Sequence, residues 1–269
     1  MPVTITSRKN ELVKEYLHLS ASASYRREQR SLPMEGARLC EDAAASGLRV
    51  ISLFYTEEAS AKYGRYLEVV EKSSPVKYLI SQSVAQYLAD TKNPQGVFCI
   101  CAMPPENAEI PCLSDGSFLM LENMQDPANL GTVLRTAEAL GIGGVILAGK
   151  CCDAYSPKAL RAGMGAIFRL PVYLRNDAPE MVAGLNAKGF RTFAAVPDES
   201  ALPVTSIDFS VPSVAVVGNE GNGLTEETKH ACTACVTIPM KGRAESLNAA
   251  ASAAVLMWEM MRAEGGGRP

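Results

Sequence analysis

From Ser117 onward, short apolar runs alternate with helical patterns, and this rhythm restricts the possible folds more than any other feature of the sequence. Strands are expected at 118–122, 144–148, 166–173, 190–195 and 213–217. Helices are expected near 129–140, 157–161, 178–188 and 245–262. Nearly continuous apolar strands of this length, separated by helices, are typical of a parallel sheet covered on both faces. The second part of the chain is therefore predicted to be an α/β domain.

The first part of the chain predicts a second, smaller α/β domain. Helices are expected around 10–19 and 36–46, and strands at 50–55, 76–80 and 96–101. The stretch 103–117 holds three prolines among polar residues and has little periodicity, which is typical of a linker. We therefore expect two domains, at 1–106 and 115–269, with the linker at about 103–117.

Composition sets the broad class of protein. A chain of 269 residues that is 47% hydrophobic is long enough for two modest cores. The formal net charge of −3 shows no overall basic character, so any contact with nucleic acid would come from a local patch. The sequence has no secretory signal and no apolar run of the roughly 20 residues that a membrane span needs. We expect a soluble, cytoplasmic protein.

The eight cysteines are expected to be reduced thiols, because a chain of this size does not need disulfides for stability. Cys232 and Cys235 follow closely after His230, which suggests a metal site. Zinc needs four ligands, however, and the other histidine, His18, is far away in the sequence. We expect ordinary packing of these thiols and no metal.

Ligands of parallel sheets collect at the carboxyl ends of the strands, so the loops after strands are the candidate sites. One such segment, LENMQDPANLGTVLRTAEALG at 121–141, places Asn129 at the start of a helix and Arg135 within it. A second, GNEGNGL, follows the strand 213–217, and a third, IPMKGRAESLN, precedes the last helix. Neither the dinucleotide fingerprint nor the P-loop pattern matches. Small residues and amides nevertheless let the backbone approach a flat, polar ligand closely.

Three segments carry a family resemblance. NLGTVLRTAEALG (129–141), VVGNEGNGL (216–224) and IPMKGRAESLNAAASAAVLMWE (238–259) resemble, in order and spacing, the three motifs of SpoU/TrmH-type RNA 2′-O-methyltransferases of the SPOUT superfamily. The first domain is similar to the RNA-binding extension of that family through ITSRKNELVKEY and SYRREQRSLPMEGARL. Leu32 stands where the family often has an aromatic residue.

The resemblance implies a fold and a cofactor. It implies that S-adenosylmethionine binds in a C-terminal SPOUT domain with a deep trefoil knot, and that a homodimer completes each site. Threaded chains are rare, so the knot rests on the resemblance alone. The implied cofactor-binding residues are Gly218, Asn219, Gly223, Ile238, Met240 and Leu247. The alternative for the glycine-rich loop is an ordinary strand-to-helix turn.

The resemblance also implies the catalytic residues, which are Arg135, Asn129, Glu220, Ser246 and Asn248. Arginine stays protonated at neutral pH, so Arg135 is expected to orient the ribose hydroxyl and a phosphate instead of acting as a base. Glu220 is expected to hold Arg135 or to fix its own loop. The alternatives are an ion pair of Arg135 with Glu138, and helix capping by Asn129, Ser246 or Glu245.

The first domain carries a local set of basic residues that the resemblance assigns to RNA binding. These residues are Arg8, Lys9, Arg26, Arg27 and Arg30. The alternative is a solvated surface, which most charged segments form. With the resemblance, contact with RNA phosphates is the preferred interpretation.

The expected function is therefore S-adenosylmethionine-dependent methylation of a ribose 2′-hydroxyl in RNA, with 23S rRNA as the expected target. The alternatives are a tRNA 2′-O-methyltransferase, a non-catalytic RNA-binding assembly factor of the same fold, and a small-molecule enzyme with a nucleotide cofactor. The sequence leaves open which nucleotide is methylated, which group accepts the proton, and whether the N-terminal basic residues are the main RNA contact.

Overall fold

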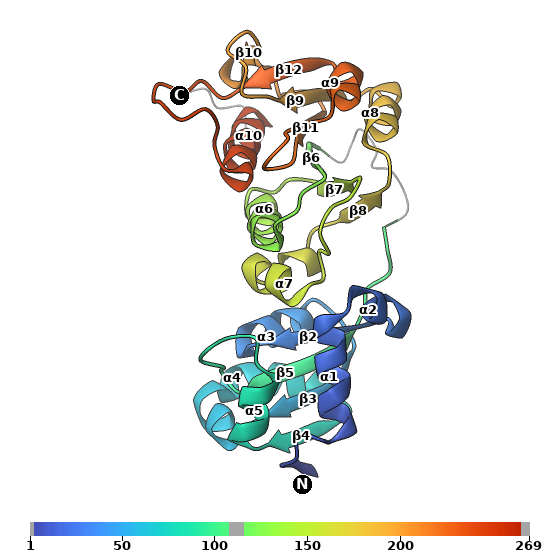
Figure 1. Ribbon diagram of the computed structural model, residues 1–269, viewed down its shortest axis with the longest axis vertical. Coiled ribbons are helices and arrows are strands. Elements are labelled where there is room, and N and C mark those ends of the chain that lie inside the picture. The colour runs from blue at the N-terminus through green and yellow to red at the C-terminus, as the bar shows by residue number, and fades with distance from the viewer. Residues whose placement is uncertain (1–2, 108–115, 265–269) are drawn as a thin grey trace. The chain divides into compact units, whose positions relative to one another are not determined.

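The computed structural model describes residues 3–107 and 116–264 (Figure 1). Its contacts divide the chain into two compact units. The first unit comprises Met1–Pro105 together with Asp153–Arg169, and the second comprises Glu106–Cys152 together with Leu170–Pro269. The middle of the expected linker, 108–115, and the C-terminal residues 265–269 lie outside the described residues.

The first unit is built on a five-stranded mixed sheet in the order β1-β4-β3-β5-β2. The strands are β1 (Val3–Ile5), β2 (Ser31–Glu35), β3 (Val50–Tyr55), β4 (Lys77–Ile80) and β5 (Val97–Ala102). β1 and β3 pair with β4 in parallel, whereas β5 is antiparallel to both β3 and β2. The helices are α1 (Glu11–Ala21), α2 (Ala23–Gln29), α3 (Ala37–Ala45), α4 (Glu57–Ser73) and α5 (Gln82–Leu88).

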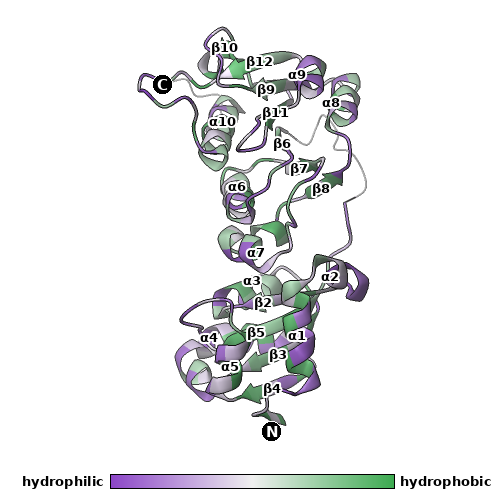
Figure 2. Cartoon of the chain, in the orientation of Figure 1, coloured by the Kyte–Doolittle hydropathy of each residue, from purple (hydrophilic) through white to green (hydrophobic). Residues whose placement is uncertain are grey.

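Several of these helices begin at a residue whose side chain caps the helix N-terminus. Asn10 accepts a hydrogen bond from the backbone N–H of Leu12 at the start of α1, and Thr56 caps α4. One apolar cluster packs α1 and α5 on the sheet, and its largest rings are Tyr16, Phe54 and Phe98. Figure 2 shows apolar strands and helices with mixed apolar and polar surfaces. The unit therefore has a core of its own.

The second unit is built on a seven-stranded sheet in the order β10-β12-β9-β11-β6-β7-β8, and every neighbouring pair is parallel. The strands are β6 (Phe118–Glu122), β7 (Gly144–Ala148), β8 (Val172–Arg175), β9 (Arg191–Ala195), β10 (Leu202–Pro203), β11 (Ser213–Val217) and β12 (Ala234–Thr237). The helices are α6 (Pro127–Ala139), α8 (Ala178–Ala187), α9 (Glu226–Ala231) and α10 (Ala249–Glu264), with a 3-10 turn at Val204–Ser206.

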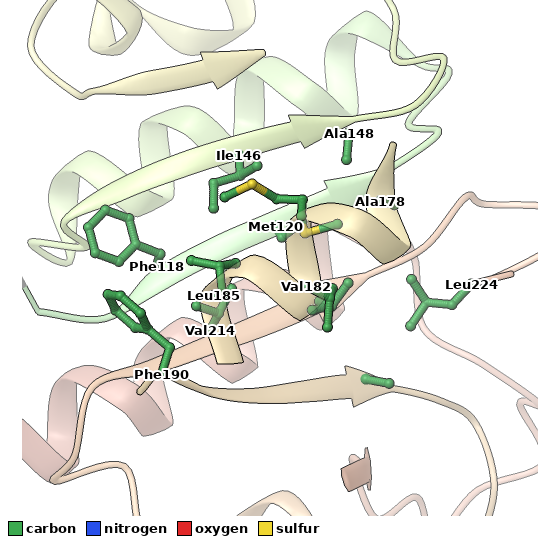
Figure 3. Close-up of a cluster of buried hydrophobic side chains, with 13 residues drawn as sticks. Phe118, Met120, Ile146, Ala148, Ala178, Val182, Leu185, Phe190, Val214 and Leu224 are labelled. Carbon is green, nitrogen blue, oxygen red and sulfur yellow. The ribbon is translucent and has the colours of Figure 1, made fainter. Parts of the chain in front are cut away.

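Both faces of this sheet are covered, as the continuous apolar strands predict. Phe118, Met120 and Val214 point to one face and pack with Val182 and Leu185 of α8 (Figure 3). α6 and α10 lie on the other side of the sheet from α8 and α9 (Figure 1). β6 and β11 are neighbours in the middle of the sheet, so the loops that follow them leave the same edge side by side.

Several elements differ from the sequence-based expectations. The strand expected at 166–173 is wrong in its first half, because Met164 and Gly165 have left-handed backbones, with φ of 47° and 73°, and a 3-10 turn follows at Ala166–Phe168. The last helix begins at Ala249 and not at Glu245. The side chain of Asn248 accepts the backbone N–H of Ala250, which marks the start of that helix.

The segment Asp153–Arg169, which contains α7 (Pro157–Gly163), packs in the first unit although the sequence suggests that it belongs with the second. Arg161 of α7 forms ion pairs with Asp90 and, at 3.6 Å, with Glu35. Arg169 lies 4.0 Å from Asp42. The chain thus crosses between the two units three times, after Pro105, after Cys152 and after Arg169.

No helix among the described residues is long and apolar enough to cross a membrane. The trefoil knot that the resemblance implies stays a prediction.

Candidate functional site

The glycine-rich loop after β11 folds back on itself. The backbones of Asn219 and Gly223 exchange two hydrogen bonds of 3.0 Å each. A Cβ atom at Gly218 would lie 2.2 Å from the carbonyl carbon of Gly223, so this position accepts no side chain. Gly223 has a φ of 68°, a left-handed conformation that favours glycine. The glycines at 218 and 223 are therefore needed for the tight shape of the loop.

The side chain of Asn219 stabilises this shape from within. Its Oδ1 accepts the backbone N–H groups of Gly221 and Asn222 at 2.7 and 3.1 Å. Its Nδ2 donates to the carbonyl oxygen of Asn123 at 2.9 Å. The amide thus holds the loop closed and also ties it to the residue that follows β6.

Glu220 lies at the N-terminus of α6. Its carboxylate accepts Nδ2 of Asn129 at 3.0 Å and, at 3.4 Å each, the backbone N–H groups of Gln125 and Asp126. Burial by itself raises the pKa of Glu220, but these hydrogen bonds outweigh it, and the pKa lies below its ordinary value. Glu220 is therefore ionised at neutral pH.

Asn129 joins the second and third motifs. While its Nδ2 donates to Glu220, its Oδ1 accepts Nδ2 of Asn248 at 3.2 Å. Asn248 in turn accepts the backbone N–H groups of Ala250 and Ala251 at the start of α10. Three segments that are far apart in the sequence thus meet through a chain of three polar side chains.

A cavity of about 370 Å³ opens beside the glycine-rich loop. The six residues that the sequence assigns to the cofactor all line it, as do Glu220 and Ser246. Backbone groups of 218–224 supply polar atoms, and Ile238, Met240 and Leu247 supply apolar surface. This mixture suits a ligand with a flat ring and several polar groups.

Arg135 is placed differently from the rest of the predicted site. It lies on α6, two turns after the N-cap Asp126, and its side chain is exposed. The described residues that line the cavity do not include Arg135, Asn129 or Asn248. Asn129 donates a hydrogen bond to Glu220, which lines the cavity, and Asn248 donates one to Asn129. Glu220 was expected to hold Arg135 or to fix its own loop, and its carboxylate instead accepts backbone N–H groups at the N-terminus of α6.

The segment ENMQD, 122–126, runs from the last residue of β6 to the N-cap of α6 and belongs to the first candidate loop of the sequence, but no role was predicted for any of its residues. Its residue Asn123 has a left-handed backbone with a φ of 56°, which is uncommon for a residue other than glycine. Oδ1 of Asn123 accepts the backbone N–H of Lys150 at 2.7 Å, and its carbonyl oxygen accepts Asn219. The position of these residues at the end of a parallel strand, together with their acids and amides, is the signal that could have pointed to them.

The predicted basic residues of the first unit do not form one uniform surface. Arg8, Lys9, Arg27 and Arg30 are exposed, and the guanidinium of Arg8 lies 5.1 Å from the ring centre of Tyr87. Arg26 is different, because it is only 3% exposed.

Arg26 is occupied by partners within the unit. It forms an ion pair with Asp153 and donates to the carbonyl oxygens of Leu19 and Ser20. Its guanidinium therefore does not face solvent, and the structure does not support counting it among the RNA-contacting side chains. A sequence pattern cannot distinguish Arg26 from its neighbour Arg27, because only the fold buries one of them.

The cysteines of the described residues are all free thiols. Burial raises the pKa of Cys232 to about 12, so this thiol is protonated at neutral pH. Within 3–107 and 116–264, no cluster of three or more His, Cys, Asp or Glu side chains is arranged to hold a metal ion.

Comparisons with known proteins agree with this geometry. Residues 116–258 match the SpoU rRNA methylase family, and residues 10–99 match the MRM3-like substrate binding domain. The chain therefore belongs to the SpoU rRNA methylase family.

Individual relatives span nearly the whole chain. The 23S rRNA (guanosine(2553)-2′-O)-methyltransferase RlmP of Bacillus subtilis is 31% identical, over 95% of this chain and 98% of the relative. The AdoMet-bound rRNA methyltransferase from Sinorhizobium meliloti has a TM-score of 0.81 at 28% identity, over 96% of this chain and 97% of that one. The SpoU methyltransferase AviRb from Streptomyces viridochromogenes, in complex with AdoMet, has a TM-score of 0.84 at 26% identity, over 97% and 100%.

Proposed function

We propose that this protein transfers the methyl group of S-adenosylmethionine to the 2′-hydroxyl of a ribose in ribosomal RNA. The observation that carries the proposal is a cavity lined by the second and third motifs, to which the first motif is joined through the hydrogen-bonded chain of Glu220, Asn129 and Asn248. The relative from Bacillus subtilis, which is named as a 23S rRNA 2′-O-methyltransferase, supports 23S rRNA as the substrate.

The cavity fits S-adenosylmethionine. Gly218 lets the backbone of Gly223 and Leu224 pack directly against it, and the residues 218–224 of this tight loop line the cavity. Ile238, Met240 and Leu247 would contact the adenosine through apolar atoms. When bound, S-adenosylmethionine supplies an electrophilic methyl group on a positively charged sulfur.

The ribose hydroxyl is a weak nucleophile and must lose its proton as it reacts. Glu220 is a poor acceptor for this proton, because its lowered pKa makes it a weak base and its carboxylate already accepts three N–H groups. Its role is to hold the glycine-rich loop against α6. The exposed guanidinium of Arg135 orients the hydroxyl and a neighbouring phosphate through two parallel hydrogen bonds.

The third motif completes the site. Ser246 lines the cavity and is available to a ligand. Asn248 connects the start of α10 to Asn129, so it keeps the third motif beside the first. The capping role that the sequence left as an alternative belongs to Asn248, and it is compatible with a role in the site.

The first unit binds the RNA. Its match to a substrate-binding domain supports this role, and Arg8, Lys9, Arg27 and Arg30 are the exposed cations that would neutralise phosphates. Arg26 is left out of this group because it is buried in an ion pair.

The resemblance also motivates a homodimer and a trefoil knot in the second unit, and the rRNA-modifying relative from Bacillus subtilis supports a cytoplasmic location. Trp258 of α10 is 52% exposed and Leu247 is 39% exposed, so a partner subunit would bury apolar surface there. Sedimentation measurements on the purified protein would test the homodimer.

Transfer of labelled methyl groups tests the central proposal. The protein is incubated with labelled S-adenosylmethionine and an in vitro transcript of 23S rRNA, and label is expected in the RNA. Once the modified nucleotide is mapped, an oligonucleotide with 2′-deoxyribose at that position should accept no methyl group. Equal methylation of the deoxy substrate would place the chemistry on a base, and transfer only to tRNA would favour the tRNA alternative.

A further inference from the structure

The five-residue segment 122–126 between β6 and α6 holds the glycine-rich loop at both of its ends. At the first end, the carbonyl oxygen of Asn123 accepts Asn219, and the N–H groups that follow it contact Glu220. At the second end, Glu122 contacts Thr225, directly after the loop. The sequence analysis assigned no role to Glu122.

Glu122 is a buried carboxylate with only hydrogen-bond donors as partners. It is the last residue of β6 and is 2% exposed. It accepts the backbone N–H of Thr225 at 3.0 Å and the hydroxyls of Thr225 and Thr228 at 2.8 Å each. A buried carboxylate is costly unless it is fully hydrogen-bonded, so these three hydrogen bonds set the position of Thr225 relative to β6.

Thr225 is also the N-cap of α9, where its hydroxyl accepts the backbone N–H of Thr228. It therefore connects the end of the loop, the start of the helix and the buried carboxylate. The loop itself contains three glycines, which allow many backbone conformations in the absence of other constraints. Fixing both ends selects the one conformation in which the loop lines the cavity.

We propose that Glu122 is a positioning residue for S-adenosylmethionine binding, which it controls by holding Thr225 and thereby the shape of the loop 218–224. Glu122 does not line the cavity in the described residues, so it acts through Thr225 and not by touching the ligand. The proposal rests on the proposed function, since it assumes that the cavity binds S-adenosylmethionine.

The main test is Glu122→Ala in the full-length protein, with affinity for S-adenosylmethionine measured by calorimetry. The dissociation constant should rise at least tenfold, because the three hydrogen bonds that hold the end of the loop are removed. Glu122→Gln keeps one carbonyl oxygen for the N–H of Thr225, so its effect should be intermediate, about threefold. Binding of a 23S rRNA transcript should stay within twofold in both variants.

The chain offers a matched control in Glu35, the last residue of β2. It is 8% exposed, accepts the backbone N–H of Asp90 at 2.9 Å and the hydroxyl of Thr91 at 2.5 Å, and also lies 3.6 Å from Arg161. Glu35→Ala also removes a buried, hydrogen-bonded carboxylate and should lower the melting temperature. Its affinity for S-adenosylmethionine should stay within twofold of the unchanged protein. If Glu122 only stabilised the fold, Glu122→Ala would behave like Glu35→Ala, with a lower melting temperature and an affinity for S-adenosylmethionine within twofold of the unchanged protein.

Variants of Thr225 test the same interaction without touching the carboxylate, and they decide the matter if Glu122→Ala fails to fold. Thr225→Val should raise the dissociation constant three- to tenfold, whereas Thr225→Ser keeps the hydroxyl and should restore it to within twofold. Combined with Glu122→Ala, Thr225→Val should add less than twofold, because both changes remove the same interaction.

Folded Glu122→Ala or Thr225→Val protein that binds S-adenosylmethionine as tightly as the unchanged protein would overturn the proposal. That result is distinct from a failure of the proposed function, in which the unchanged protein itself would not bind S-adenosylmethionine.

Discussion

The five-stranded sheet of the first unit mixes parallel and antiparallel pairs, whereas all neighbouring strands of the seven-stranded sheet run parallel. In the parallel sheet, every strand ends at the same edge, so the segments after β9, β11 and β12 meet there and form the cavity wall. In the mixed sheet, β5 and its neighbours end at opposite edges. Strand direction therefore explains why the multi-loop site is built in the second unit.

The polar contacts of the two units also differ. The first unit uses ion pairs, such as Arg26 with Asp153 and Arg161 with Glu35. The candidate site in the second unit uses amides, hydroxyls and carboxylates that accept N–H groups, such as Asn129 with Glu220. Changes in the second unit should therefore affect catalysis and cofactor binding, whereas changes in the first should affect stability and RNA binding.

The largest effect is expected at Arg135. Arg135→Ala should lower turnover by about a thousandfold, because the variant lacks the group that orients the hydroxyl in a charged, bidentate geometry. Affinity for S-adenosylmethionine should stay within a few fold, since Arg135 does not line the cavity in the described residues. Arg135→Lys should recover little activity because an ammonium cannot replace the planar guanidinium. A large decrease in cofactor affinity, measured by calorimetry, would remove Arg135 from the catalytic role.

The next largest effect is expected on the stability of the first unit, when its buried ion pair is broken. Arg26→Ala should lower the free energy of unfolding by about 3 kcal/mol, because it leaves the carboxylate of Asp153 without its partner. Urea denaturation followed by circular dichroism measures this change. The adjacent, exposed Arg27 is the matched control, and Arg27→Ala should change stability by less than about 0.5 kcal/mol. Equal effects at both positions would contradict the assignment.

Charge reversal of the exposed basic residues tests the RNA-binding role of the first unit. The triple variant Arg8→Glu, Lys9→Glu and Arg27→Glu should bind the 23S rRNA transcript at least tenfold more weakly. The slope of log affinity against log salt should become shallower by roughly 0.7 to 0.9 for each phosphate that the variant no longer neutralises. Arg65→Glu on α4 is the control, because Arg65 is also exposed but lies outside this group. An unchanged salt slope in the triple variant would show that these residues do not bind the RNA.

A smaller effect is expected on the pH dependence of activity when Glu220 is replaced. Since its pKa lies below the ordinary value of 4.5, Glu220 stays ionised above that pH, and its hold on the loop weakens only as the pH falls through the lowered pKa. Activity profiles between pH 6 and 9 should therefore have the same shape for the unchanged protein and for Glu220→Gln, although the variant is less active. Disappearance of a titration from this range in the variant would identify Glu220 as the proton acceptor.

The smallest effect is expected at the cysteines near α9. Cys232→Ser combined with Cys235→Ser should stay folded and active, because no cluster of three or more metal-binding side chains is present in the part of the chain that the structure describes. Elemental analysis of protein purified without chelator should find no stoichiometric zinc. A tightly bound equivalent of zinc that disappears in the double variant would show the opposite.

Much of the fold followed from local patterns. The strands 50–55, 118–122, 144–148 and 213–217 were predicted with the bounds that the structure has, because continuous apolar runs between turn residues leave few alternatives. The short edge strands β1 and β10 were missed because neither has a run of apolar residues long enough to detect. The expected strand at 166–173 was half wrong because the left-handed backbone of Met164 is set by the turn and not by apolar periodicity.

The sequence by itself determined the α/β class and the three motifs, because spacing and residue type are local properties. The family resemblance of those motifs implied six of the residues that line the cavity. Only the tertiary structure decided which charged residues are buried, as at Arg26, and which carboxylates hold the loop, as at Glu122. Burial depends on neighbours that are far away in the sequence, such as Asp153 for Arg26 and Thr228 for Glu122. No local pattern contains that information, so the interactions that position the site became visible only once the strands had been brought side by side.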